Sequence, residues 1–244
     1  MAAKPHRYTE QLIDLLLATA DIEDPSWLKR LEDGDEKYRA ALVALTPLRK
    51  QVEPYRRVRT EADEAERRLR EEQARAAQLQ ATRSKLNELK NLLLTITAED
   101  PQRRGQSLET LLNQLFALFD IDTKSSFRVV GEQIDGAFTH EGTEFLLEAR
   151  WRAVRAAVKD LDGFSGTIDR KLDNTLGVFL SVNGFEPTAI ELFSQNRPRL
   201  FLMDGADLSA VVDDRISSPD LLTRKRQHAA HTGEVFIGAY SILS

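Results

Sequence analysis

Residues 127–151, FRVVGEQIDGAFTHEGTEFLLEARW, decide the fold of this chain. Residues 127–138 and 143–151 are rich in the apolar, aromatic and β-branched side chains that are typical of strands. The tripeptide His140-Glu141-Gly142 between them is short and contains glycine, as the connection of a hairpin usually does. The stretch therefore predicts two antiparallel strands joined by a tight turn.

The sequence around this hairpin predicts an α/β domain. Apolar residues at helical spacing predict a helix before it, starting near Ser107. The elements expected after it are a helix over 152–172 with a break near Gly163 to Gly166, an apolar strand over 176–182, a helix over 187–194 and a short strand over 199–203. An unbroken apolar strand is typical of the centre of a sheet that is covered on both faces. The order of elements therefore indicates a mixed sheet flanked by helices.

Three charged side chains interrupt the apolar pattern of the hairpin, namely Asp135, Glu148 and Arg150. Residues two apart on a strand share a face, so Glu148 and Arg150 emerge together, and the hairpin brings Asp135 beside Glu148. Carboxylates within a buried strand are costly unless they are paired or bind a metal ion. Two carboxylates suit Mg²⁺, which polarises phosphate oxygens and activates water for phosphodiester hydrolysis. The alternative is a structural ion-pair cluster at the end of a sheet.

At these residues the sequence resembles the restriction-endonuclease superfamily, and within it the Mrr-like branch. The signature of that superfamily is an acid, a spacer, and then acid-any-lysine on the next strand. The resemblance covers roughly residues 105–236 and rests on three motifs: Gly105-Gln106-Ser107-Leu108-Glu109 on the leading helix, GEQIDGAF at 131–138, and Glu148-Ala149-Arg150-Trp151. Twelve residues separate Asp135 from Glu148, which is a usual spacing in the family.

The resemblance implies a restriction-endonuclease-like core with a metal site. It implies that Asp135 and Glu148 hold Mg²⁺, or Mn²⁺ in its place, with the backbone carbonyl of Ala149 as a third ligand. Glu109 on the leading helix would be an accessory acid. The Gln133 side chain, within the first acidic motif, is expected to contact the nucleic acid.

Arg150 departs from the family pattern because it stands where the catalytic lysine is usual. Arginine stays protonated at any ordinary pH, so it cannot act as a base, although it still binds phosphate or orients water. Some family members carry the working lysine on the following helix, and here Lys171 or Lys159 would take that role. The alternative reading is a catalytically inactive, nuclease-like interaction protein.

A basic segment near the end of the chain, Arg224-Lys225-Arg226, predicts a ridge that contacts phosphates or a partner subunit. His228 and His231 follow at a spacing that would suit a zinc pair, but no third ligand is near them in the sequence. A solvated basic helix is the plain alternative.

Residues 1–98 predict a helical, coiled-coil arm, followed by a linker at 99–104 and the nuclease-like domain at 105–244. A seven-residue rhythm runs between Val58 and Leu93, although several of its positions are alanine or charged. Pro47 and Pro54 should kink or restart the helix. We expect the arm to hold copies together or to dock onto a larger defence complex, and a solvated helix packed on its own domain is the alternative.

Composition narrows the classes of function. The net charge of -5 argues against a DNA packager coated in positive charge, and the absence of cysteine excludes disulfides, thiolate zinc sites and cysteine nucleophiles. No glycine-rich phosphate loop and no apolar membrane span occurs in the sequence. We therefore expect a cytoplasmic, Mg²⁺-dependent DNA endonuclease of restriction or anti-phage defence, without a membrane partner. An enzyme that acts on RNA or is activated by a nucleotide is a third option.

Overall fold

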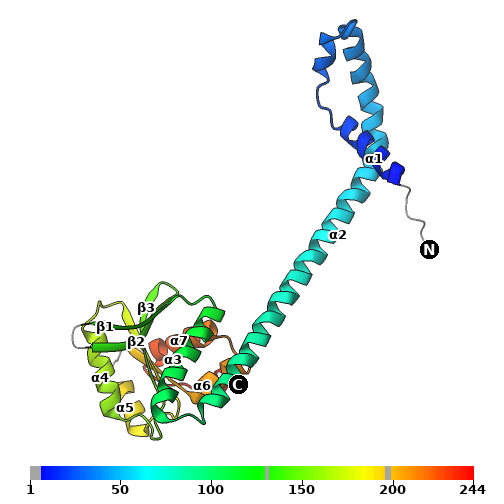
Figure 1. Ribbon diagram of the computed structural model, residues 1–244. Coiled ribbons are helices and arrows are strands. Elements are labelled where there is room, and N and C mark those ends of the chain that lie inside the picture. The colour runs from blue at the N-terminus through cyan, green and yellow to red at the C-terminus, as the bar shows by residue number, and fades with distance from the viewer. Residues whose placement is uncertain (1–6, 130–131, 196–198) are drawn as a thin grey trace. The chain divides into compact units, whose positions relative to one another are not determined.

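The computed structural model describes residues 7–129, 132–195 and 199–244, without the side chains of residues 7, 8, 10, 124–129 and 132–135. The chain divides into two compact units, Met1–Ala77 and Gln78–Ser244. The first unit is helical, and the second combines helices with a sheet (Figure 1). The helix α2 (Gly34–Ile96) contributes residues to both units.

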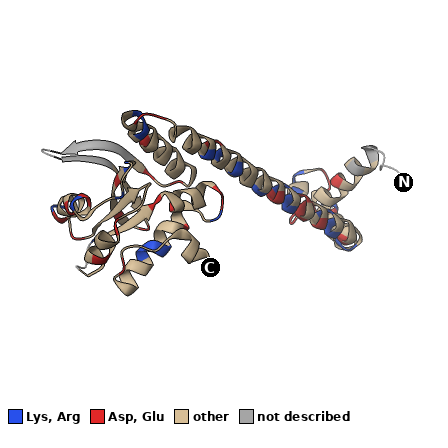
Figure 2. Ribbon diagram, turned by 90° about the horizontal axis from the view of Figure 1, so that it is seen from below, with Lys and Arg blue, Asp and Glu red and all other residues tan. Residues whose placement is uncertain are grey.

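The long helix predicted over residues 58–93 is confirmed as part of α2, which has 63 residues. Lys and Arg alternate with Asp and Glu along it (Figure 2), and several of them pair across one turn. Examples are Arg57 with Glu61 at 3.3 Å and Arg68 with Glu64 at 3.5 Å. Pairs of this kind support a solvated helix by only about 0.2–0.5 kcal/mol each.

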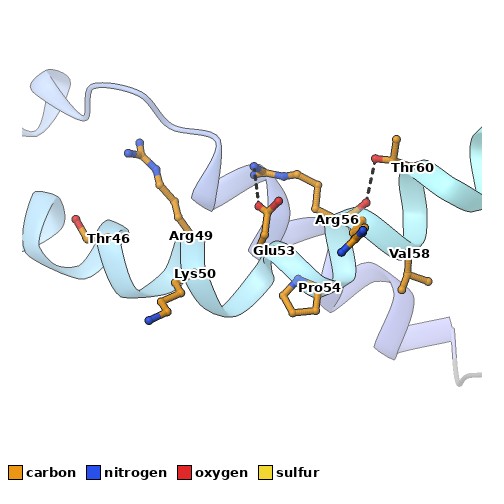
Figure 3. Close-up of a pocket in the computed structure, with 9 residues that line it drawn as sticks. Thr46, Arg49, Lys50, Glu53, Pro54, Arg56, Val58 and Thr60 are labelled. Carbon is orange, nitrogen blue, oxygen red and sulfur yellow. Dashed lines mark hydrogen bonds and ion pairs between the residues drawn. The ribbon is translucent and has the colours of Figure 1, made fainter.

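The first unit packs α1 (Arg7–Ala20) against the start of α2, with the short 3-10 helix η1 (Ser26–Arg30) between them. The guanidinium of Arg49 donates hydrogen bonds to the carbonyl oxygens of Ala20 (3.0 Å) and Ile22 (2.7 Å), which satisfies free carbonyls at the end of α1. Arg49 also lines an open groove on α2, where it projects to one side of the helix and Lys50 to the other (Figure 3).

Pro47 and Pro54 lie inside α2, so they do not restart the helix, and of the two predicted effects only the kink stays a prediction. An interior proline removes one backbone hydrogen bond and crowds the preceding turn, at a cost of about 3 kcal/mol. Val52, between the two prolines, is buried against α1. Apolar packing therefore offsets part of that cost.

The second unit is a five-stranded mixed sheet between two layers of helices, as the fold class predicted. Its strands follow the order β1-β2-β3-β4-β5, antiparallel from β1 to β3 and parallel from β3 to β5. The elements after α2 are α3 (Pro101–Leu118), β1 (Thr123–Val129), β2 (Glu132–His140), β3 (Thr143–Arg150), α4 (Val158–Asp169), β4 (Thr175–Ser181), α5 (Pro187–Gln195), β5 (Leu200–Asp204), α6 (Gly205–Val212), α7 (Ser218–Thr232) and α8 (Ala239–Leu243).

The two faces of the sheet have separate apolar cores. One core joins the sheet to α3, α6, α7 and the end of α2, and the other joins it to α4 and α5. On β3 the residues alternate between these cores, since Leu147 packs in the first and Leu146 in the second. The position of Glu148 is therefore on the same face of the sheet as Leu146, which is the face covered by α4.

The predicted hairpin is confirmed as β2 and β3, with a register that runs from Gly136↔Leu147 to His140↔Thr143. Glu141 and Gly142 form its turn, with φ of 48° and 72°. Two positive φ values in succession match the twist of the flanking strands, and glycine adopts the second at little cost.

The prediction of one strand over residues 127–138 is wrong, because β1 and β2 are separate antiparallel strands in which Phe127 pairs with Ile134. The sheet therefore has one strand more than expected. Gly131, between the two strands in the sequence, was the available signal of a break.

The boundary between arm and domain also differs from the prediction. The helix α3 begins at Pro101, where the Asp100 carboxylate accepts hydrogen bonds from the N–H groups of Gln102 and Arg103. Aspartate followed by proline is a strong helix start, so residues 99–104 are not an extended linker. Residues of α2 from Gln78 onward belong to the second unit, and the buried side chains that hold them there are Leu86, Leu89 and Ile96.

Two smaller differences concern the helix after the hairpin. It begins at Val158 rather than at residue 152, and Gly163 and Gly166 lie inside it without a break. The intervening residues 151–157 connect the site strand β3 to this helix.

Candidate active site

The candidate site lies where β3 ends. In the parallel register with β4, Glu148 pairs with Phe179 and Arg150 with Ser181. The last pair in the register of the hairpin is Gly136↔Leu147. Asp135 on β2 and Glu148 on β3 are the residues directly beyond this pair. The backbone thus brings Asp135 and Glu148 to neighbouring positions, as expected, while the Asp135 side chain lies outside the described part.

Arg150 is held from three sides. Its Nε donates to Glu148 Oε1 at 2.9 Å, its Nη1 donates to Asp160 Oδ1, and its guanidinium carbon lies 5.2 Å from the centroid of the Phe179 ring. The Glu148, Arg150 and Asp160 side chains are only 17–23% exposed. The contacts fix the direction of the guanidinium before any ligand arrives.

Asp160 is a site residue that the sequence analysis missed. It lies in the first turn of α4, accepts a hydrogen bond from the Ala157 N–H at 3.1 Å, and also contacts Arg152 Nη1 at 3.0 Å. Burial acts to raise the pKa of Asp160, but the Ala157 hydrogen bond and the charges of Arg150 and Arg152 together lower it below its ordinary value. The carboxylate therefore stays ionised beside Arg150. An acid at the third position of a helix was the available signal.

The donor set can be compared with the ligands that Mg²⁺ requires. Among the described residues no three His, Cys, Asp or Glu side chains gather as a metal cluster. Mg²⁺ commonly uses only one or two carboxylates and keeps several waters, so Glu148 together with an acid on the neighbouring strand matches its chemistry. Oxygen donors of this kind fit the ion.

The structure also gives the positions of the other two expected ligands, Ala149 and Glu109. Ala149 lies between Glu148 and Arg150 on β3. Glu109 is half-buried on α3, and α3 covers the sheet face opposite to α4. Their role as ligands stays a prediction.

The two candidate lysines lie at opposite ends of the sheet. Lys171 precedes Thr175, which pairs with Glu144 at the start of β3. Arg150 lies six positions after Glu144 along the strand, or ~20 Å at ~3.3 Å per residue. The expectation that Lys171 completes the site is therefore wrong. Lys159 is exposed in the first turn of α4, next to Asp160, at the correct end.

The structure also corrects the prediction of a basic ridge on α7. Lys225 is 2% exposed and forms an ion pair with Asp207 at 2.6 Å, so it does not reach a nucleic acid. Arg226 forms an ion pair with Glu141 in the hairpin turn, at the end of β3 away from Glu148. Arg224 is exposed, and the side chain of Gln133 lies outside the described part. As for the histidine pair, His228 contacts Glu234 at 3.1 Å.

Residues 102–212 match the Mrr catalytic-domain family model, described as restriction endonuclease. No curated protein matches the sequence. None of the helices in the described ranges combines the length and apolar character needed to cross a bilayer.

Three solved structures resemble the chain distantly. The MspJI restriction endonuclease, solved with a 27-mer oligonucleotide, is 12% identical over 62% of this chain and 36% of its own, with a TM-score of 0.36. The DNA modification-dependent restriction endonuclease AspBHI is 15% identical over 59% and 40%, with a TM-score of 0.37. The protein of unknown function AF1548 is 13% identical over 49% and 65%, with a TM-score of 0.33. The chain spans less than two thirds of each.

Proposed function

We propose that this chain, in which residues 102–212 carry a restriction-endonuclease domain, hydrolyses phosphodiester bonds of DNA with Mg²⁺, or Mn²⁺ in its place. The observation that carries the proposal is the convergence at the end of β3. Glu148 and Arg150 share one face there, and Asp135 occupies the next position on β2. Restriction or anti-phage defence is the setting that the family description supports.

Glu148 and Asp135 would hold the ion, with the carbonyl of Ala149 and with Glu109 as further candidates. When bound, such an ion polarises a phosphate oxygen and lowers the pKa of water. The side chains of the protein would position the phosphate and balance its negative charge. Arg150 presents a fixed guanidinium that binds the scissile phosphate in two-pronged fashion, and Asp160 keeps that guanidinium in place.

Arg150 cannot take a proton from water, so its role is to bind and orient. Lys159 beside Asp160 provides the ammonium that the family usually carries on the strand. We propose Lys159 rather than Lys171 as the lysine of the site, because only Lys159 lies at this end of the sheet.

Variants of Arg150 test the proposal. Arg150→Ala should slow cleavage of plasmid DNA more than tenfold, which is ~1.4 kcal/mol of transition-state stabilisation. Arg150→Lys should be tolerated or faster, and Lys159→Ala should also slow the reaction. Initial rates with Mg²⁺ measure these effects, and Lys171→Ala is the control that should leave the rate unchanged.

The ion pair between Arg150 and Glu148 supports a second candidate function, that of an inactive nuclease-like scaffold. In a scaffold the same contact would simply neutralise a buried acid. Cleavage would then be absent in the wild type and in Arg150→Ala alike, and Arg150→Lys would be the variant that gains activity.

We also propose that the chain forms homo-oligomers through α2. The heptad positions Leu69 and Leu79 are 52% and 51% exposed, which suits a stripe that packs on another helix. Cutting both strands of a duplex needs two active sites or two visits, so pairing of copies serves the proposed activity. Docking of this stripe onto a larger defence complex is the other outcome.

Glutamate at Leu69 and Leu79 should break this association. The double variant should lower the molar mass seen by light scattering to the 27.6 kDa of one chain, because charges at seam positions are costly. Gln78→Glu, at a position outside the heptad seam, is the matched control. An unchanged oligomer in the double variant would move the interface away from this stripe.

A further inference from the structure

Arg104 lies on the other side of the same strand end. It belongs to the first turns of α3, and its guanidinium carbon lies 5.7 Å from the centroid of the Trp151 ring. Trp151 directly follows Arg150 in the chain. Because successive side chains of a strand point to opposite faces, Arg104 and Arg150 flank the end of β3 from its two faces.

One N–H donor of the Arg104 guanidinium has no acceptor within the described part of the chain. Its Nε is buried and has no hydrogen-bond partner there. Buried N–H groups are almost always paired, and leaving one unpaired is costly. The Trp151 ring is a cation–π partner of this group, but it supplies no acceptor for the N–H donors.

The neighbouring arginines differ from Arg104 in this respect. Arg103 lies 3.5 Å from Asp100, and Arg152 lies 3.0 Å from Asp160. Each of these two arginines thus has a carboxylate of the protein as a partner. Arg104 has no carboxylate partner among the described residues, so its guanidinium can bind an acceptor that comes from outside the chain.

We propose that Arg104, supported by Trp151, binds a phosphate of the DNA backbone adjacent to the phosphate that is cleaved. The inference rests on the proposed function, since the ligand is the substrate of that site. The planar guanidinium presents its outer N–H donors as a fixed fork, which fits two oxygens of a phosphate, and the Trp151 ring lies beside it as a cation–π partner. A strand that crosses the end of β3 meets Arg150 on one face and Arg104 on the other.

Salt-dependent binding of a labelled DNA duplex to the full-length protein tests this contact. Fluorescence anisotropy, with Ca²⁺ in place of Mg²⁺ to prevent cleavage, gives the affinity at several salt concentrations. Arg104→Ala should weaken binding about tenfold and reduce the slope of log affinity against log salt by about 0.9, the contribution of one phosphate contact in duplex DNA. Arg104→Lys should keep most of the slope and lose part of the affinity.

Two further variants separate binding from folding. Arg57→Ala removes one exposed charge from α2 and should leave affinity and slope unchanged. Trp151→Phe keeps a ring beneath Arg104 and should bind better than Trp151→Leu. Thermal melting curves show whether each variant is folded.

The outcomes distinguish the two proposals. If the wild type binds DNA and Arg104→Ala keeps the wild-type salt slope, the Arg104 contact is overturned while the proposed function stands. A loss of affinity without a change in slope would mean a structural role and would also overturn it. A wild type that does not bind DNA at all removes the proposed function, and the contact with it.

Discussion

Replacing Glu148 by glutamine should reduce DNA cleavage by about a thousandfold or more, which is typical for loss of a central group of an active site. The amide keeps the size of the side chain and removes the charge that would hold the metal ion. Asp135→Asn should have a similar effect, because its strand position neighbours that of Glu148. Cleavage of supercoiled plasmid with Mg²⁺, followed by gel electrophoresis, measures both.

Glu144→Gln is the matched control for these two variants. Glu144 is an exposed carboxylate on the same strand, and its contact with Thr139 at 2.8 Å lies at the other end of β3. Its rate should equal that of the wild type. Full activity of Glu148→Gln and Asp135→Asn would place the chemistry elsewhere in the chain.

Lys225→Met should destabilise the second unit by about 3–5 kcal/mol, the usual effect of removing one partner of a buried ion pair. Lys225 Nζ lies 2.6 Å from Asp207 Oδ2 and also donates to the carbonyl oxygens of Leu202 (3.0 Å) and Ile237. Burial raises the pKa of Asp207 and lowers the pKa of Lys225, so each charge depends on the other for stabilisation. Urea unfolding followed by circular dichroism measures the change.

The same substitution on the surface is the control. Lys90 forms an ion pair with Asp213 at 2.7 Å, and both side chains are at least one third exposed. Lys90→Met should cost less than ~1 kcal/mol, because solvent screens the pair. A cost of similar size in both variants would mean that burial of Lys225 does not govern its contribution.

The hairpin was predictable because its signals are local. The glycine in its turn and the two-residue spacing of Glu148 and Arg150 fix which side chains share a face. The long helix was predictable for the same reason, since its heptad rhythm lies within one segment. Both depend on residues that are close in the sequence.

The errors concern contacts between segments that are far apart. Lys171 was a candidate because some family members carry the working lysine on the helix after the site strand, but the parallel pairing of β3 with β4 places it at the opposite end of the sheet. Asp160 was missed because only the packing of α4 brings it to Arg150. No local sequence pattern predicts this contact between Asp160 and Arg150.

The burial of Lys225 was predictable from its helical spacing, but the basic residues on either side of it suggested exposure instead. Its basic neighbours Arg224 and Arg226 suggested a solvated ridge, yet Lys225 falls three and four residues after Leu222 and Leu221, on the buried side of α7. Helical periodicity predicted burial, and the carboxylate of Asp207 makes that burial tolerable. A charge on the apolar side of a helix therefore indicates a buried partner.

The most direct test of the central claim is incubation of the purified wild-type protein with supercoiled plasmid DNA in Mg²⁺, in Mn²⁺ and in chelator. The account predicts nicked or linear DNA with either metal ion and intact plasmid with chelator, because the proposed role of Glu148 and Asp135 is to hold that ion. Intact plasmid with every metal ion would contradict the account and favour the inactive scaffold. Equal cleavage in chelator would contradict the metal site itself.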